Sequence, residues 1–129
     1  MSGSVLLDTN IVIALFASDR AVTEKLAEVE EVFISSIVLG ELYLGAHNSS
    51  RKEENLARLD AFAESNTILR CDERTAKRYG EIKRQLKVSG TPIPENDIGI
   101  SAVAMQFSLT LVTRDKHFGT VDDLRLERW

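Results

Sequence analysis

Apolar residues along the chain fall into two alternating patterns. Short runs of consecutive apolar residues predict strands at residues 5–7, 32–34, 67–69 and 109–113, with an edge strand at 124–126. Between these runs the apolar residues recur every three or four positions, which predicts helices at residues 11–17, 22–29, 37–46, 51–63, 72–87 and 95–107. Because strands separated by helices form right-handed crossovers, we expect an α/β fold with a parallel sheet and helices on both faces.

Chain length and composition are those of one globular domain. The 129 residues are 43% hydrophobic and 28% charged, and both prolines lie in one loop, so we assign residues 1–129 to a single domain. The single cysteine, Cys71, rules out an intrachain disulfide, and the longest apolar run, residues 11–17, is too short to span a membrane. No basic leader opens the chain, and we expect a cytoplasmic protein.

Two acidic residues follow predicted strands. Asp8 ends the run 5–7, and Asp115 lies two residues beyond the run 109–113. Ligands of parallel α/β sheets bind at the carboxyl ends of the strands, so both carboxylates belong at the functional edge. Taken singly, Asp8 is equally well explained as a helix N-cap and Asp115 as a turn residue.

Two further acids lie on predicted helices among apolar neighbours. Glu41 has no basic residue three or four positions away, and Asp97 is followed by a largely apolar stretch. A carboxylate on a helix face that should be core is costly unless it is protonated, paired or bound to a metal. Asp97, together with Asn96, can also be a helix cap, whereas Glu41 is harder to explain in another way.

The four carboxylates taken together favour a divalent metal site. They would repel one another if they converged without local cations, and a bound metal ion removes that repulsion. Carboxylate and water ligands suit Mg²⁺ or Mn²⁺. Zn²⁺ is disfavoured because the chain has two histidines, His47 and His117, and one thiol. We expect His47 to be a solvated helix-end residue and His117 a loop residue that could also touch substrate.

The segments around these acids resemble those of a known family. Four of them, in sequence order, look like the acidic motifs of PIN-domain nucleases: Leu6-Leu7-Asp8-Thr9-Asn10, Gly40-Glu41-Leu42-Tyr43-Leu44-Gly45-Ala46, Pro94-Glu95-Asn96-Asp97-Ile98 and Val112-Thr113-Arg114-Asp115-Lys116-His117-Phe118. Their order and spacing are most similar to the VapC toxins of bacterial and archaeal toxin–antitoxin pairs. Each motif is weak by itself, whereas the four in order are specific, and the resemblance covers nearly the whole chain.

The resemblance implies a three-layer α/β/α sandwich with a central, mostly parallel sheet and a metal-dependent ribonuclease site that uses Mg²⁺ or Mn²⁺. The catalytic acids and metal ligands that it implies are Asp8, Glu41, Asp97 and Asp115. Thr113 matches a polar residue of the same site, and Asn10 and Asn96 are candidate supporting contacts. The resemblance also implies RNA as the substrate, a cognate antitoxin encoded beside the gene, and a homodimer.

Within such a site we expect the four acids to have separate roles. Asp8 and Asp97 would be the main metal ligands, and Asp115 would bind the same metal ion or a second one. Glu41 would orient or deprotonate the attacking water. Arg114, which precedes Asp115, could reach a phosphate.

Charge is unevenly distributed along the chain. Twenty acids against 16 bases give a formal net charge of −4, which argues against a general nucleic-acid coating protein. Residues 70–90 nevertheless hold seven basic residues and three acidic ones. Lys83 and Arg84 in this stretch are candidate contacts for an RNA backbone, and a solvated helix face with ion pairs explains them equally well.

Three other functions compete with a ribonuclease. A receiver-type phosphoacceptor domain needs a paired acid after its first strand, where Thr9 and Asn10 follow Asp8 here. A haloacid-dehalogenase-like phosphatase needs a second aspartate at the position of Asn10. A catalytically silent binding module of the same fold is disfavoured because all four acids are present.

Overall fold

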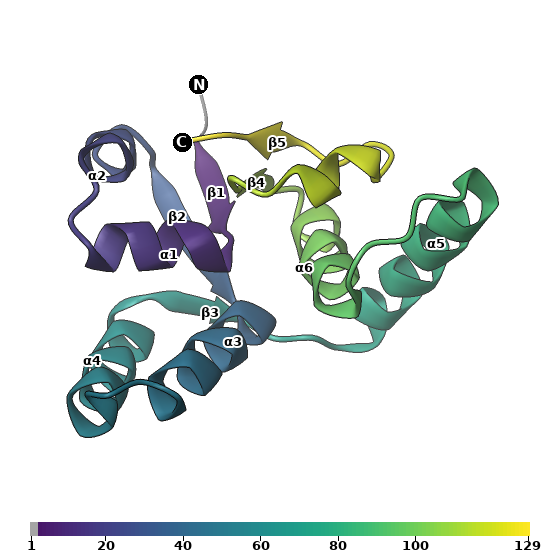
Figure 1. The fold of residues 1–129 in the computed structure, drawn as a ribbon. Helices are drawn as coiled ribbons and strands as arrows, with labels where there is room; N and C mark the ends of the chain where they lie inside the picture. Colours follow the sequence, from purple (N-terminus) through teal and green to yellow (C-terminus); the bar gives the residue numbers. More distant parts are fainter. Residues whose placement is uncertain (1–2) are drawn as a thin grey trace.

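The computed structural model describes residues 3–129, which form five strands in one sheet. The strands are β1 Ser4–Leu7, β2 Glu31–Ser35, β3 Thr67–Leu69, β4 Thr110–Val112 and β5 Leu126–Glu127. The helices among the described residues are α1 Thr9–Phe16, α2 Arg20–Leu26, α3 Ser36–His47, α4 Lys52–Ser65, α5 Glu73–Ser89, α6 Glu95–Gln106 and the 3-10 helix η1 Lys116–Thr120. The strand order is β3-β2-β1-β4-β5, and each of these pairings is parallel (Figure 1). The expected α/β fold with a parallel sheet is confirmed.

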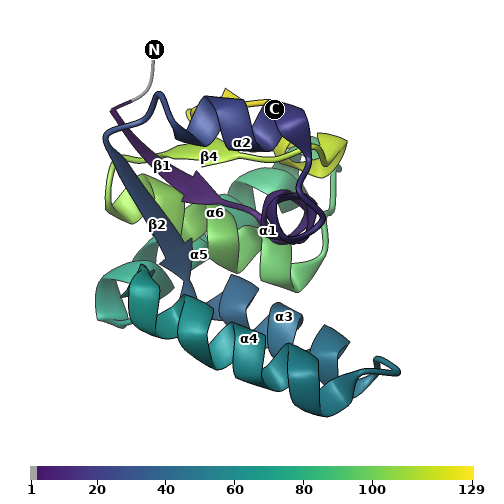
Figure 2. The same ribbon diagram turned by 90° about the vertical axis from the view of Figure 1, so that its left-hand side faces the viewer.

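Helices cover the sheet on both sides, which makes a three-layer α/β/α sandwich. Helices α1 and α2 lie on one side of the strands and α5 and α6 on the other (Figures 1 and 2). Residues Val5, Leu6 and Leu7 of β1 are each exposed by 1% or less. A strand covered on both faces is continuously apolar, which is why this segment shows no alternation. No helix within residues 3–129 combines the length and the apolar character that crossing a bilayer requires.

The strand order places a topological switch beside β1. The chain runs outward from β1 through β2 to β3, and then returns to place β4 on the other side of β1. The backbone N–H of Asp8, just past β1, donates to the carbonyl of Val112 at the end of β4 at 2.9 Å. Helix α3 contacts both α1 and α6, so it lies close to this edge of the sheet. Ligands of α/β sheets bind outside the carboxyl ends of the strands at such a switch.

The observed boundaries differ most from the predicted ones after β4. The last strand is Leu126–Glu127 rather than 124–126, because Leu124 packs against the core instead of pairing with β4. Residues Lys116–Thr120 form η1, which the apolar pattern did not predict. Phe118, in the middle of η1, is fully buried and anchors this segment to the core.

Candidate active site

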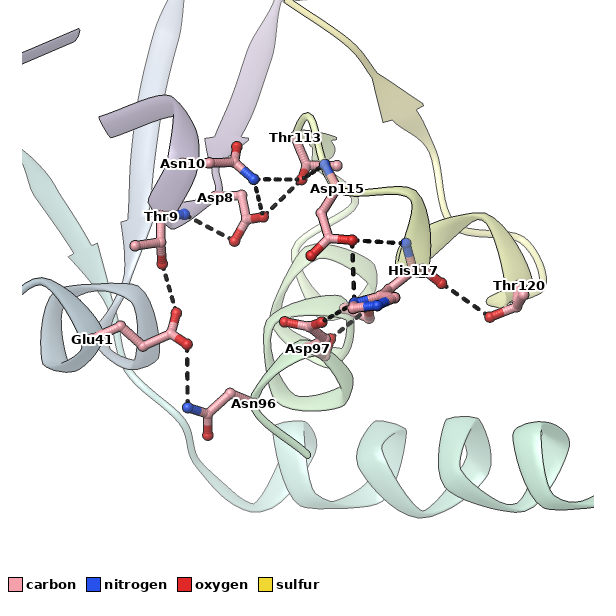
Figure 3. A network of polar contacts seen from close by, with 11 residues as sticks. Asp8, Thr9, Asn10, Glu41, Asn96, Asp97, Thr113, Asp115, His117 and Thr120 are labelled. Carbon is pink, nitrogen blue, oxygen red and sulfur yellow. Dashed lines mark hydrogen bonds and ion pairs between the residues drawn. The ribbon is translucent and has the colours of Figure 1, made fainter. Parts of the chain in front are cut away.

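Asp8 is buried at the junction of β1 and α1. One carboxylate oxygen accepts a hydrogen bond from the backbone N–H of Thr9 at 2.8 Å, and Asp8 is the N-cap of α1. The other oxygen accepts from the Thr113 hydroxyl at 2.7 Å and from the Asn10 side-chain amide at 3.3 Å (Figure 3). The cap needs only the first oxygen, so capping does not explain the contacts of the second one with the loop after β4.

Thr113 and Asn10 join the start of α1 to the loop after β4. The Thr113 hydroxyl accepts from the backbone N–H of Asp115 at 3.0 Å and from the Asn10 amide at 3.5 Å. The Asn10 carbonyl oxygen accepts from the backbone N–H of Arg114 at 3.2 Å. The two acids that follow strands, Asp8 and Asp115, are therefore held on either side of one polar network.

Glu41 reaches the site from α3. Its carboxylate accepts from the Thr9 hydroxyl at 2.6 Å and from the Asn96 side chain at 3.3 Å, and so links α3 to the first turns of α1 and α6 (Figure 3). The expectation that Glu41 lies on a core face is wrong, because the residue is partly exposed. The buried residues of α3 are Val38, Leu42 and Ala46. Glu41 stands beside them, on the lining of an open groove.

Asp97, Asp115 and His117 form a second group at the same edge. Asp97 lies in the first turn of α6 with 13% of its side chain exposed. Helix α6 begins after Pro94 without a side-chain cap, so capping does not explain Asp97. Asp115 caps η1 by accepting from the backbone N–H of His117 at 2.9 Å. One possible ligand atom from each of Asp97, Asp115 and His117 lies within 4.8 Å of the other two.

No sequence pattern indicated a role in the site for Thr9, and His117 was expected only as a loop residue that could also touch substrate. Thr9 donates to Glu41 across 32 positions of sequence, and no local pattern marks such a contact. His117 Nδ1 lies 3.3 Å from Asp97 Oδ2 and 3.1 Å from Asp115 Oδ1. The one available signal was the spacing of two residues between Asp115 and His117, which suits a capped turn.

Burial and neighbouring negative charges raise the pKa of two of the site's carboxylates, those of Asp8 and Asp97. Burial raises the pKa of Asp8 above its ordinary value, and the charges of Glu41 and Asp115 add to the rise, while hydrogen bonds oppose it. Burial also raises the pKa of Asp97, and the charges of Asp8 and Asp115 add to it. The four acids of the sequence motifs are therefore close enough for their charges to act on one another's neighbours in the site.

Replacement of Asp8 by asparagine is expected to stabilise the metal-free protein. Asparagine keeps a good N-cap and removes a charge that is unfavourable to bury. Because the pKa of Asp8 is higher in the folded chain than in the unfolded chain, the folded protein binds more protons, and its stability falls as pH rises above about 4. Urea unfolding in EDTA should give Asp8→Asn an advantage of about 0.5–2 kcal/mol at pH 7, and a smaller one at pH 4. A variant less stable than the wild type at pH 7 would contradict this electrostatic account.

The basic candidates on α5 lie in different surroundings. Lys83 forms an ion pair with Glu95, the first residue of α6, and this pairing raises the pKa of the lysine. Arg84 faces a separate depression that Glu81 and Val88 also line. The contacts of Lys83 favour the interpretation of a solvated helix face with ion pairs, and RNA binding by Lys83 or Arg84 stays a prediction.

The guanidinium of Arg114, which was expected to reach a phosphate, is bound by other parts of the chain. Its guanidinium donates to Asp19 Oδ2 at 3.0 Å and to the backbone carbonyl of Trp129 at 2.8 Å. Asp19 is at the same time the N-cap of α2. Arg114 thus ties the loop after β4 to α2 and to residue 129, and its expected reach toward a phosphate finds no support in this geometry.

The donors at this edge fit a divalent cation. Asp97 and Asp115 offer carboxylate oxygens that are close enough to share one ion. Asp8 and Glu41 add negative charge nearby: the charge of Asp8 contributes to the raised pKa of Asp97, and the charge of Glu41 contributes to that of Asp8. A hard cation such as Mg²⁺ or Mn²⁺ prefers these oxygen donors and would relieve the repulsion among them.

The PIN domain family profile matches residues 5–124, a span that includes all four acids. The chain belongs to the PIN-domain family. This membership decides against the receiver-type and haloacid-dehalogenase-like alternatives, which are different families.

Relatives match this PIN domain along almost its whole length. Ribonuclease VapC2 of Haemophilus influenzae is 38% identical over 129 residues, and the tRNA(fMet)-specific endonuclease VapC of Shigella flexneri is 34% identical over 127 residues. Each of these matches covers 96% of both chains. Among solved structures, VapBC2 from Rickettsia felis bound to a DNA fragment from its promoter has a TM-score of 0.89 at 32% identity and covers 98% of both chains. The resemblance to VapC proteins is thereby confirmed.

Proposed function

We propose that this PIN domain is a metal-dependent endoribonuclease that hydrolyses RNA phosphodiester bonds and acts as the toxin of a toxin–antitoxin pair. The proposal is carried by the convergence of Asp8, Glu41, Asp97 and Asp115 at the carboxyl edge of the sheet (Figure 3). Similarity to VapC ribonucleases supports RNA as the substrate.

We expect the acids to have different tasks in the reaction. Bound Mg²⁺ or Mn²⁺ would supply a Lewis acid for the phosphate and lower the pKa of the attacking water. Asp97 and Asp115, with Asp8 deeper in the site, would hold that ion. Hydrogen bonds from α1 and α6 hold the Glu41 carboxylate, which would orient the water and accept its proton. The water oxygen bonds to phosphorus while the bond to the leaving RNA oxygen breaks.

Cleavage of RNA by the purified chain tests this function. Protein treated with EDTA and then dialysed should cut total cellular RNA only after Mg²⁺ or Mn²⁺ is returned, and it should leave DNA intact. Equal cleavage in excess EDTA would point to a contaminating or metal-independent nuclease. Absence of cleavage with either metal would favour the catalytically silent binding module.

An apolar groove next to Glu41 is the site where we expect the antitoxin to dock. The groove lies between α1, α3 and α4 and has a volume of about 330 Å³. Its lining is mostly apolar with three polar side chains, and consists of Ile13, Phe16, Leu42, Gly45, Ala46, Leu59, Glu41, Asn55 and Arg58. Ile13 is 55% exposed, and Leu44 on the neighbouring helix surface is 64% exposed. A peptide seated in this groove would cover apolar surface and keep RNA from Glu41.

A bulky side chain at Gly45 should weaken antitoxin binding. A Cβ built at Gly45 meets no other atom within 4 Å, so Gly45→Phe can be accommodated and would fill the groove. Gly80→Phe on α5 is a matched control, because this helical glycine has equally open surroundings. Calorimetry with the antitoxin encoded by the neighbouring gene should give an affinity loss of about tenfold or more for Gly45→Phe alone. Equal affinities of the two variants for the antitoxin would show that the antitoxin does not bind in this groove.

The family resemblance also leads us to propose a homodimer in the cytoplasm. Sedimentation equilibrium of the purified protein should give a species of twice the 14.4 kDa chain mass. A single-chain mass at micromolar concentration would contradict the dimer and leave the proposed catalytic activity untouched.

A further inference from the structure

The imidazole of His117 stands between two of the site's acids. Its Nδ1 lies 3.3 Å from Asp97 Oδ2 and 3.1 Å from Asp115 Oδ1, so one nitrogen faces both carboxylates (Figure 3). About half of the His117 side chain is exposed. The ring therefore lines the site while one side of it remains open to solvent.

The fold holds His117 in this place through contacts of its own segment. Asp115 accepts from the backbone N–H of His117 at 2.9 Å, and the Thr120 hydroxyl donates to the His117 carbonyl at 3.0 Å. The next residue, Phe118, is fully buried in the core and anchors η1. The backbone that carries the imidazole is thus fixed on both sides, and its direction toward α6 is built into η1.

The spacing of the three side chains suits ligands of one metal ion. Neighbouring ligands of a cation with bonds of about 2.1 Å, set at right angles, lie about 3 Å apart. The two distances from His117 Nδ1 to the carboxylate oxygens are 3.1 and 3.3 Å. An imidazole nitrogen is a common metal ligand and suits transition metals, whereas Mg²⁺ prefers oxygen ligands only.

We propose that His117 binds the divalent ion through Nδ1 together with Asp97 and Asp115, and that this mixed nitrogen and oxygen site prefers Mn²⁺ to Mg²⁺. The inference rests on the proposed metal-dependent function and adds a ligand and a metal preference to it. A different arrangement would have His117 act as a local counter-charge that turns away when a metal ion enters. The two arrangements differ in whether a nitrogen atom is bonded to the metal.

Pulsed electron paramagnetic resonance of bound Mn²⁺ tests the proposal directly, because a bonded imidazole gives a ¹⁴N coupling. The chain has two histidines, and His47, the last residue of α3, is exposed. The wild type and His47→Asn should show the ¹⁴N coupling, and His117→Asn should lose it. Bound Mn²⁺ without ¹⁴N coupling in the wild type, or coupling that persists in His117→Asn, would overturn the proposal.

Calorimetry adds the metal preference. His117→Asn should weaken Mn²⁺ binding by about tenfold or more and Mg²⁺ binding by much less, with His47→Asn as the control. Equal losses for the two ions would overturn the stated preference. If Mn²⁺ binds without a nitrogen ligand, the role of His117 is refuted but the proposed metal-dependent ribonuclease is not. If the wild-type chain binds neither ion, both the role of His117 and the metal-dependent ribonuclease are refuted.

Discussion

Asp97→Asn is expected to lower the rate of RNA cleavage by about 10³-fold. Asp97 is mostly buried, in the first turn of α6, with one carboxylate oxygen next to His117 and in reach of Asp115. The amide is similar in size and removes a negative charge from the proposed metal site. The loss should appear in kcat at saturating Mg²⁺ and RNA, measured on a fluorescent oligoribonucleotide that the wild type cuts.

Asp123→Asn is the matched control for this variant. Asp123 is exposed on the loop between η1 and β5, and its φ of 65° is a conformation that asparagine accepts readily. The Asp123→Asn protein should cleave RNA at the wild-type rate. An Asp97→Asn protein that folds and retains more than a tenth of the wild-type rate would remove Asp97 from the catalytic centre.

Phe118→Ala should destabilise the protein by about 3–5 kcal/mol, the usual cost of truncating a buried phenylalanine. Phe118 is fully buried in the main core cluster, and it anchors the helical turn that follows Asp115. Phe107→Ala is the control, because Phe107 is 42% exposed at the end of α6. Urea unfolding should show a large loss for Phe118→Ala and a loss below about 1 kcal/mol for Phe107→Ala. Similar losses for both variants would show that η1 is not anchored through Phe118.

The parts of the fold that sequence could predict are those with strong local patterns. The continuous apolar run of β1 and the three-to-four spacing of α5 are recorded in neighbouring residues, so both elements lie close to their predicted places. The position of Asp8 and Asp115 at one edge of the sheet could be predicted because the carboxyl ends of parallel strands lie at the same edge. Alternation of strands and helices was sufficient for the fold class.

The remaining features depend on contacts between distant parts of the chain. The partners of Arg114 are Asp19 and Trp129, and neither is marked by local spacing. Glu41 lies on α3, but its hydrogen bonds come from Thr9 on α1 and Asn96 on α6, which are distant in the sequence. η1 is fixed mainly by the burial of Phe118, one apolar residue in a polar segment, so periodicity gave no sign of it or of the position of His117.

The most direct test of the account is whether the acids at the sheet edge bind a divalent ion. Thermal unfolding of EDTA-treated protein should shift upward with Mg²⁺ for the wild type, by about 2.7 kcal/mol of added stability at a hundred times the dissociation constant. Asp8→Asn and Asp97→Asn should unfold at temperatures that Mg²⁺ leaves unchanged. An equal Mg²⁺ shift in the wild type and both variants, or no shift in the wild type, would contradict the metal site.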